Sequence, residues 1–501
     1  MKYVITQHAF PSVDPVFKAR AVNGDFLRGH MSSLSLPSSA PRILLCVHQF
    51  FPTFSAGTEV LTLSTAKALR SLGYDVRVVT GALTQAQLYS SDSYEFQGFT
   101  VHRIWTPYRQ GQFTAETVVD EYDNQNIVPE FEAVLESFEP DLVHFFHFKN
   151  LTLSCLQSCL KRNIPTVFTP TDYWLTCRTC QLLKPWGTPE CNGPASHAEN
   201  CLKHLLMNTN KRVLVDSVKI VPAKMIALLF QILSYLPFSR LARYRRMYID
   251  LKSRKSIITG YLSKTDLILP PTRSIKSLLE ANQISGRKIQ PLKYAVEPPV
   301  ITQELILREH SKSGSYTIGF IGTLITHKGC HVLLDAIKMI DNKNIDIRIY
   351  GDTEHYPDYV ASLRAQCAED ERVHFVGTFA PDLIGDVMAD LDALVIPSIW
   401  RENAPLVLLN ALASGLPVIA SDVTGITEYL NSEDAVELFP AGNSHALAQV
   451  LKNHLNAFKS GTTGLHRTPR VAGSTLKIYA KALDKAYIGL IKRPHEKTEI
   501  L

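Results

Sequence analysis

One stretch, residues 394–430, constrains the fold more than any other part of the chain. It begins with the short apolar run Leu394, Val395 and Ile396, which ends in Pro-Ser as a buried parallel strand does. A second apolar run begins at Val418, and the residues between the two runs carry apolar side chains at helical spacing. Strand, helix and strand in this order predict an open α/β sheet, which binds ligands at the carboxyl ends of its strands.

The loop between the first strand and the helix is placed for ligand binding. It contains Glu402 and leads into Pro405, which suits the first turn of a helix because its missing N–H costs nothing there. Gly415 is expected to end the helix in a left-handed conformation, and Pro417 prevents its continuation. Helix N-termini favour anionic groups, so the sequence predicts a phosphate-binding position beside Glu402.

Length and composition limit the class of protein. A chain of 501 residues is too long for one ordinary core and predicts two domains. The net charge of +5 is weak and gives no argument for nucleic acid. We expect no secretory signal in the charged first 41 residues and no spanning helix, since no run of about 18 apolar residues occurs. Nine cysteines in such a chain favour the reducing cytoplasm.

The first domain is predicted over residues 42–293, after an N-terminal extension of residues 1–41. An apolar strand over residues 43–50, a turn containing Gly57, a helix over residues 58–72 and a second strand form a βαβ unit, the start of a doubly wound sheet. The turn needs a small residue if a phosphate is to approach its backbone.

Candidate acceptor-side residues follow two later strands. His144 and His147 follow a strand that starts after Pro140, and Asp172 follows the next strand in Thr-Pro-Thr-Asp-Tyr-Trp. A histidine at the carboxyl end of a strand can orient an acceptor or take its proton, and Asp172 can do the same. The alternative is that each is a hydrogen-bonded core histidine. This alternative carries more weight for His144 than for His147.

A cysteine-rich insertion is predicted over residues 177–204. Cys177 and Cys180 form a CxxC pair, and Cys191 and Cys201 follow at longer spacings. Four thiolates suit tetrahedral zinc, so a structural zinc site at these cysteines is one hypothesis; an iron–sulfur cluster and free or paired cysteines are the others. The insertion borders the expected acceptor side and could shape acceptor specificity.

The segment 213–256 combines an apolar stretch with a basic one. Residues 225–238 are strongly apolar, and the basic residues follow up to Lys255. Such a pair of helices can lie in a membrane interface and bind anionic lipid, which predicts peripheral membrane contact through residues 225–255. The alternative is a core helix followed by a solvated basic helix.

The second domain is predicted over residues 300–473, with a terminal helix over residues 474–491. Its first strand ends at Gly322 and Thr323, and Lys328 precedes the next helix. A lysine in that frame can bind phosphate; alone it would be a solvated surface residue.

Taken together, residues 42–490 resemble the family 4 glycosyltransferases. That family has a Glu, seven residues and a second Glu where this chain has Glu402 and Asn410. The resemblance implies a GT-B fold, α/β with two Rossmann-like domains of parallel sheets facing a central cleft, and a last helix that crosses back to the first domain. It also implies hexosyl transfer from a nucleotide sugar to an acceptor hydroxyl, with retention of anomeric configuration and no metal required for catalysis.

The resemblance assigns roles residue by residue. Glu402 would contact the donor sugar, Asn410 the ribose, and His147 and Asp172 would act on the acceptor. The donor-binding set would be Gly57, Gly322, Thr323, Lys328, Glu402, Asn403, Ala404, Leu406 and Asn410. Three positions depart from the family pattern: Asn410 replaces a Glu, Thr171 a His and Thr323 an Arg.

The expected partners are a nucleotide-sugar donor and a glycan or lipid-linked acceptor at the inner face of the membrane, with no nucleic acid. The three departures favour one rival hypothesis, a degenerate GT-B protein that binds a nucleotide sugar or a partner without turnover. A second rival is a sugar-nucleotide epimerase. A third, a zinc-dependent nucleic-acid binder, lacks the basic and aromatic residues it needs around the cysteines.

Overall fold

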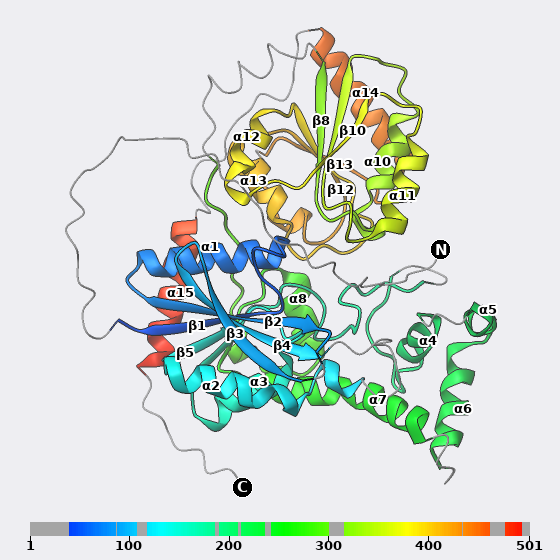
Figure 1. Ribbon diagram of the computed structural model, residues 1–501. Helices are drawn as coiled ribbons and strands as arrows, with labels where there is room; N and C mark the ends of the chain where they lie inside the picture. Colours follow the sequence, from blue (N-terminus) through cyan, green and yellow to red (C-terminus); the bar gives the residue numbers. More distant parts are fainter. Residues whose placement is uncertain are drawn as a thin grey trace, which may run out of the picture.

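The computed structural model describes residues 40–86, 88–107, 118–185, 190–208, 212–235, 242–299, 315–432, 434–460 and 476–492. Nearly all of the predicted N-terminal extension and the start of the predicted terminal helix at residue 474 lie outside these ranges. The described residues form two α/β units, one above the other in Figure 1, which agrees with the two predicted domains.

The first unit contains a seven-stranded sheet in the order β3-β4-β2-β1-β5-β6-β7. Its strands are β1 (Arg42–Val47), β2 (Asp75–Thr84), β3 (Ser90–Phe96), β4 (Phe99–Pro107), β5 (Leu142–Phe145), β6 (Thr166–Phe168) and β7 (Leu267–Ile268). All neighbours pair in parallel except β3 and β4, a hairpin at the edge that the sequence pattern did not reveal.

Helices cover the first sheet and then extend away from it (Figure 1). Those near the sheet are α1 (Gly57–Ser71), α2 (Val128–Phe138), α3 (Thr152–Lys161) and α8 (Arg273–Ala281). The extension consists of α4 (Glu199–Met207), α5 (Arg212–Ile220), α6 (Ala223–Tyr235) and α7 (Ala242–Leu262). Cys155 and Cys159 on α3 are fully buried and pack as small apolar side chains.

The second unit contains a six-stranded, all-parallel sheet in the order β10-β9-β8-β11-β12-β13. Its strands are β8 (Tyr316–Ile321), β9 (Ile345–Tyr350), β10 (Val373–Gly377), β11 (Ala393–Ile396), β12 (Val418–Ser421) and β13 (Val436–Phe439). Its helices are α10 (Cys330–Ile337), α11 (Pro357–Gln366), α12 (Ile384–Ala389), α13 (Leu406–Ser414) and α14 (Ser444–Lys459).

Each sheet has one point at which the order of strands reverses. In the first sheet β1 lies between β2 and β5, and in the second β8 lies between β9 and β11. Ligands of open α/β sheets bind outside the carboxyl ends of the strands at such a point. The loops there contain Gly57 and His147 in the first unit, and Lys328 and Glu402 in the second.

The last helix, α15 (Leu476–Ile491), returns to the first unit and packs on α1 (Figure 1). Asp484 accepts a hydrogen bond from Tyr74 at 2.6 Å, and the Tyr487 hydroxyl lies 2.5 Å from Nδ1 of His144. An apolar cluster continues from α1 and α15 of the first unit to α13 of the second. The two units therefore share part of one core.

Candidate active site

Glu402 lies in the loop after β11 and is 3% exposed. Its Oε1 accepts hydrogen bonds from Lys328 Nζ at 2.6 Å and from Ser398 Oγ at 2.6 Å. Burial opposes ionisation, but the Lys328 ammonium and these hydrogen bonds hold the pKa of Glu402 below its ordinary value. The structure therefore brings together, as an ion pair, two residues that the sequence assigned to one donor site.

Two glycines allow this close approach. Gly329, next to Lys328, has φ +74°, and a Cβ there would lie 1.8 Å from the carbonyl oxygen of Pro397. Gly425 has φ +90°, and its Cβ would lie 1.9 Å from the carbonyl oxygen of Glu402. Any larger residue at either position would push the Glu402 loop away from its neighbours.

The helix after Glu402 begins one residue later than predicted. Pro405 precedes α13 as its N-cap, with φ −69° and ψ 116°, so Leu406 is the first helical residue. The first intrahelical bond is donated by the amide of Leu408, which leaves the amide of Leu406 outside the helical ladder. Gly415 ends the helix with φ 68°, as predicted. Asn410 lies one turn along and is partly exposed.

The other donor-side candidates occupy neighbouring positions. Gly322 and Thr323 directly follow β8, beside the strand that leads to Glu402. Gly57 begins α1, is exposed, and has no atom within 4 Å of the position that a Cβ would occupy. Gly57 therefore has open space beside it, and no protein contact in the described part requires a glycine there.

Asn403 differs from its predicted role in donor binding. Its side chain is buried and donates to the carbonyl oxygen of Pro170 at 3.1 Å and to the Tyr294 hydroxyl at 3.3 Å. The Tyr173 hydroxyl donates to the carbonyl oxygen of Glu402 at 3.4 Å in the same region. The Asn403 side chain thus joins the two units, and the loop of Asp172 contacts the loop of Glu402.

Buried His147 and partly exposed Asp172 form a pair on the first unit. His147 Nε2 lies 2.8 Å from Asp172 Oδ2, and His147 Nδ1 accepts from the amide of Lys149 at 2.9 Å. Since an amide can only donate, the proton of a neutral ring is on Nε2, where it bonds to Asp172. Both nitrogens are engaged, and this geometry suits His147 to orienting Asp172.

Asp172 keeps its charge in this environment. Burial favours the neutral acid, but His147 and the amide of Trp174, at 2.7 Å, hold the pKa of Asp172 below its ordinary value. Its side chain is 23% exposed and can be reached by an acceptor. Thr171, at the position of the family histidine, donates to the carbonyl oxygen of Phe146 at 3.1 Å.

His144 is a core residue. It is fully buried, and its ring nitrogens lie at hydrogen-bond distance from the hydroxyls of Tyr487 and Thr169. Burial lowers the pKa of His144 to about 3, so the ring stays neutral. Of the two alternatives that the sequence left open, the core histidine is the correct one.

Two residues near this site were missed by the sequence interpretation. Glu59 is fully buried on α1, and its Oε1 lies 3.6 Å from Nε2 of His48. The rings of His48 and His147 are 4.4 Å apart. Burial raises the pKa of Glu59 to about 7. The signal was present, since Glu59 stands two residues after Gly57 and His48 directly follows β1.

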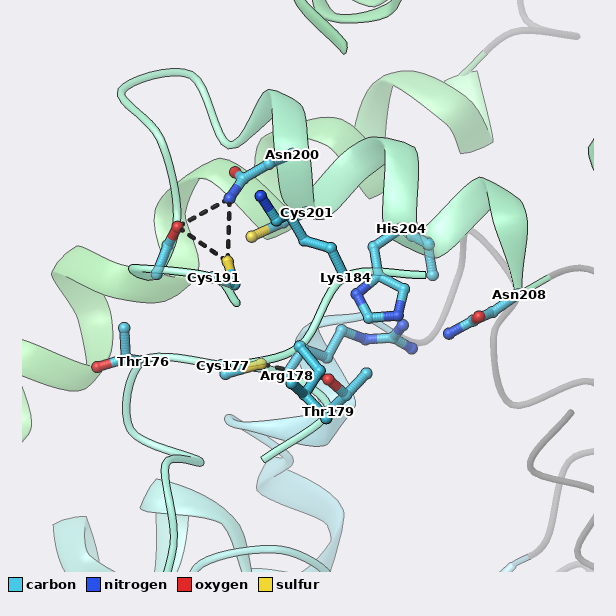
Figure 2. Close-up of a pocket in the computed structure, with 13 residues that line it drawn as sticks. Thr176, Cys177, Arg178, Thr179, Lys184, Cys191, Asn200, Cys201, His204 and Asn208 are labelled. Atoms are coloured by element: carbon cyan, nitrogen blue, oxygen red, sulfur yellow. Dashed lines mark hydrogen bonds between the residues drawn. The ribbon is translucent and has the colours of Figure 1, made fainter. Parts of the chain in front are cut away.

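The structure separates the four cysteines that were grouped as one zinc site. The sulfur of Cys180 lies within 4.8 Å of donor atoms of His147 and Asp172. In the described part of the chain, no other three possible metal ligands lie as close to one another. Cys177, Cys191 and Cys201 instead line a pocket that does not include Cys180 (Figure 2). Cys180 has a left-handed backbone conformation, with φ 66°.

The apolar stretch forms a helix, α6, with one buried and one exposed side. Ile226 and Ala227 are buried, whereas Met225, Leu228, Leu229 and Ile232 are each more than half exposed. The core-helix alternative therefore does not describe this segment. None of the helices in the described residues is long and apolar enough to cross a membrane.

Comparison with known proteins gives two family matches. Residues 56–220 match the family described as "Glycosyl transferase 4-like domain", and residues 315–457 match "Glycosyl transferases group 1". The amylovoran biosynthesis glycosyltransferase AmsK of Erwinia amylovora is 26% identical over 211 residues, 40% of this chain and 50% of that protein. The phosphatidyl-myo-inositol mannosyltransferase of Mycobacterium leprae is 31% identical over 128 residues, 25% of this chain and 33% of that protein. The chain thus matches half or less of the length of these relatives.

Solved structures share the fold over most of the chain. Anabaena HepE in complex with UDP and glucose has a TM-score of 0.58 at 15% identity. The match covers 89% of this chain and 99% of the HepE chain. Sucrose-phosphate synthase of Thermosynechococcus elongatus has a TM-score of 0.60 at 15% identity, with 90% and 99% coverage. These likenesses confirm the predicted GT-B fold. The two family matches together cover more than half of the chain, and the chain belongs to the glycosyltransferases of family 4.

Proposed function

We propose that this protein transfers a hexosyl group from a nucleotide-sugar donor to an acceptor hydroxyl. The observation that carries the proposal is the ion pair between partly exposed Lys328 and buried Glu402, which lies beside the N-terminus of α13. It combines a cation, a carboxylate and free helix amides in one place, which suits a diphosphate joined to a sugar.

Different residues of the second unit would bind different parts of the donor. Lys328 has three N–H donors and gives one to Glu402, so the others can reach the diphosphate. Stabilising the charge that develops on the departing diphosphate is the main catalytic task. Glu402 can accept from the sugar hydroxyls, and Asn410 on α13 can bond the ribose hydroxyls. The nucleotide donor is supported by HepE, which binds UDP and glucose.

The first unit would supply the acceptor side. Asp172, held by His147, is the charged group that can accept a hydrogen bond from the attacking hydroxyl. We propose retention of the anomeric configuration and catalysis without a metal ion. Amylovoran biosynthesis and phosphatidyl-myo-inositol, named for two relatives, support a polysaccharide or lipid-linked acceptor.

A membrane surface is the proposed location of the reaction. The exposed side chains Met225, Leu228, Leu229 and Ile232 recur at i, i+3, i+4 and i+7 on one face of α6. Two exposed cations, Lys219 and Lys224, lie beside this face in the sequence. Apolar side chains next to lysines suit an anionic bilayer. All nine cysteines are free, which supports the cytoplasmic face.

Transfer is tested by incubating the protein with UDP-, GDP- and ADP-hexoses and a panel of glycan and lipid-linked acceptors. Formation of a glycosylated product whose anomeric configuration matches that of the donor supports the proposal. Binding of nucleotide diphosphates by calorimetry without product from any pair would favour the degenerate rival. An isomerised donor in the absence of acceptor would favour the epimerase.

Membrane contact is tested separately by sedimentation with vesicles. Wild-type protein should bind vesicles that contain anionic phospholipid and not purely zwitterionic ones. The double substitution Leu228→Asp with Ile232→Asp should abolish this binding. Leu383→Asp, at a site of similar exposure on the second unit, should leave it unchanged. Equal binding by all variants would contradict the assignment of α6.

A further inference from the structure

The pocket in the cysteine-rich insertion contains four possible zinc ligands from three places in the chain. Cys177 follows the turn of Tyr173 and Trp174, and Cys191 lies in the loop before α4. Cys201 and His204 are three residues apart on α4, so their side chains share one face of that helix. Figure 2 shows these four side chains around one opening.

We propose that Cys177, Cys191, Cys201 and His204 bind one structural zinc ion. Three thiolates and one imidazole form a common tetrahedral ligand set for zinc. The pocket encloses about 30 Å³ of free space, enough for a body the size of a water molecule. This assignment replaces Cys180 of the sequence-based hypothesis by His204.

The charges around the pocket fit such an ion. Zinc with three thiolates carries one net negative charge, which would be costly to bury alone. Arg178 and Lys184 line the pocket, and Arg254 on α7 is 4% exposed. These cations would compensate the charge of the zinc site.

Two of the contacts among the pocket residues are weak ones that involve sulfur. Asn200 Nδ2 donates to Cys191 Sγ at 3.4 Å, and Cys177 Sγ lies 3.2 Å from Thr179 Oγ1. Among the described residues, no three of these four donor atoms lie within 4.8 Å of one another. Zinc binding would therefore draw the two loop cysteines toward the helix. The alternative group of His147, Asp172 and Cys180 is already joined by the His147–Asp172 hydrogen bond.

The position of the zinc ion would give it a role in ordering the cleft. The amides of Thr176 and Cys177 donate to the carbonyl oxygen of Tyr173, in the turn that follows Asp172. From the other side, Arg401 bonds to Glu190 and Asn192 at 3.3 Å each. The zinc ion would thus fix the segment that lies between the Asp172 turn and the residue next to Glu402.

The first experiment measures the metal content of the purified full-length chain. About one zinc per chain is expected for wild type. Cys201→Ser and His204→Ala should lose it. Cys180→Ser and His197→Ala, the matched cysteine and histidine controls, should keep it. Absence of zinc from wild type, or its loss in a control with retention in His204→Ala, would overturn the assignment.

A second measurement does not depend on variants that lose the fold. Wild-type protein with cobalt in place of zinc should show the absorption of a tetrahedral site with three thiolates. His204→Cys should keep the metal and increase the thiolate-to-cobalt absorption by about one third. In the zinc-loaded wild type, a chelator should expose Cys177, Cys191 and Cys201 to alkylation and leave the reactivity of Cys367 unchanged. An octahedral cobalt spectrum would contradict the proposal.

Discussion

The two sides of the candidate site are called the donor wall, around Glu402, and the acceptor wall, around Asp172, after the roles proposed for them. They differ in how their charged groups are paired. On the second unit, Glu402 has a lysine and a serine as partners, and two glycines hold the surrounding loops together. On the first unit, Glu59 is fully buried and His48 is partly buried, and Glu59 Oε1 lies 3.6 Å from His48 Nε2, too far for a strong hydrogen bond. The charged groups of the donor wall are therefore held in a fixed arrangement. On the acceptor wall, the protonation states of Glu59 and His48 depend on the groups around them.

The largest effect is expected on the donor wall, from Lys328→Ala. It removes the cation that would stabilise the leaving diphosphate and leaves Glu402 buried without its charge partner. Transfer should fall by about 10³-fold in kcat, measured by product formation at saturating donor. Lys338→Ala, which removes a surface lysine from an exposed pair with Asp335, is the control and should retain full activity. A decrease in kcat of less than tenfold for Lys328→Ala would show that the phosphate site lies elsewhere.

The rigidity of the donor wall is tested by Gly425→Ala. The new Cβ would collide with the Glu402 carbonyl oxygen at a backbone φ that favours glycine. We expect a loss of unfolding free energy of about 3 kcal/mol, measured by chemical denaturation. Gly286→Ala, where no atom lies within 4 Å of the added carbon, should cost less than about 1 kcal/mol. Equal losses would mean that the close approach is unimportant.

The acceptor wall is tested through the pH dependence of Glu59→Gln. The folded-state pKa of Glu59 is raised from an ordinary 4.5 to about 7. Between these values the folded chain binds more protons than the unfolded chain, so this group makes stability fall as pH rises. Above pH 7 the cost is at most about 3 kcal/mol.

Glu59→Gln should remove that cost and flatten the stability profile between pH 4.5 and 7. The measurement is denaturant unfolding of both proteins at pH 5 and pH 8. The exposed Glu369→Gln should give a profile parallel to wild type. A profile of Glu59→Gln that is also parallel would show that Glu59 does not carry the titration.

The two acceptor-side candidates should differ in effect. Asp172→Asn should lower kcat by about 10²-fold, because it removes the charge that can accept the proton of the attacking hydroxyl. His147→Gln, which can still donate one hydrogen bond to Asp172, should lower it by only about tenfold. Both are measured at saturating donor and acceptor. A larger effect for His147→Gln would make the histidine the proton acceptor.

The smallest effect is expected for Asn410→Glu on α13. A carboxylate bonds a ribose hydroxyl more strongly than an amide does. The dissociation constant of the nucleotide diphosphate should therefore fall by about two- to fivefold or stay unchanged, measured by calorimetry. The neighbouring Ala413→Glu, also partly exposed, is the control and should leave the constant unchanged. Loss of binding in Asn410→Glu would mean that this pocket accommodates another ligand.

The sequence predicted a residue's position correctly where the residue directly follows a strand, because the strand then places it at the edge of the sheet. Lys328 and Glu402 follow the neighbouring strands β8 and β11, so their motifs placed them together. The prediction failed where the environment comes from distant segments. His144 lies at hydrogen-bond distance from the hydroxyl of Tyr487, 343 residues away. The side chain of Asn403 donates a hydrogen bond to the carbonyl oxygen of Pro170, 233 residues away. Likewise, spacing alone could not show that the sulfur of Cys180 lies within 4.8 Å of a donor atom of Asp172.

The return of α15 to the first unit has a mechanical consequence. The chain passes between the units twice, once between α8 and β8 and once between α14 and α15. Two tethers leave rotation about the line that joins them as the easiest relative motion, whereas a single linker would allow the units to swing in any direction. Two connections therefore restrict how far Glu402 and Asp172 can be displaced sideways from each other, and the shared apolar cluster and the hydrogen bonds of Asn403 add to this restraint.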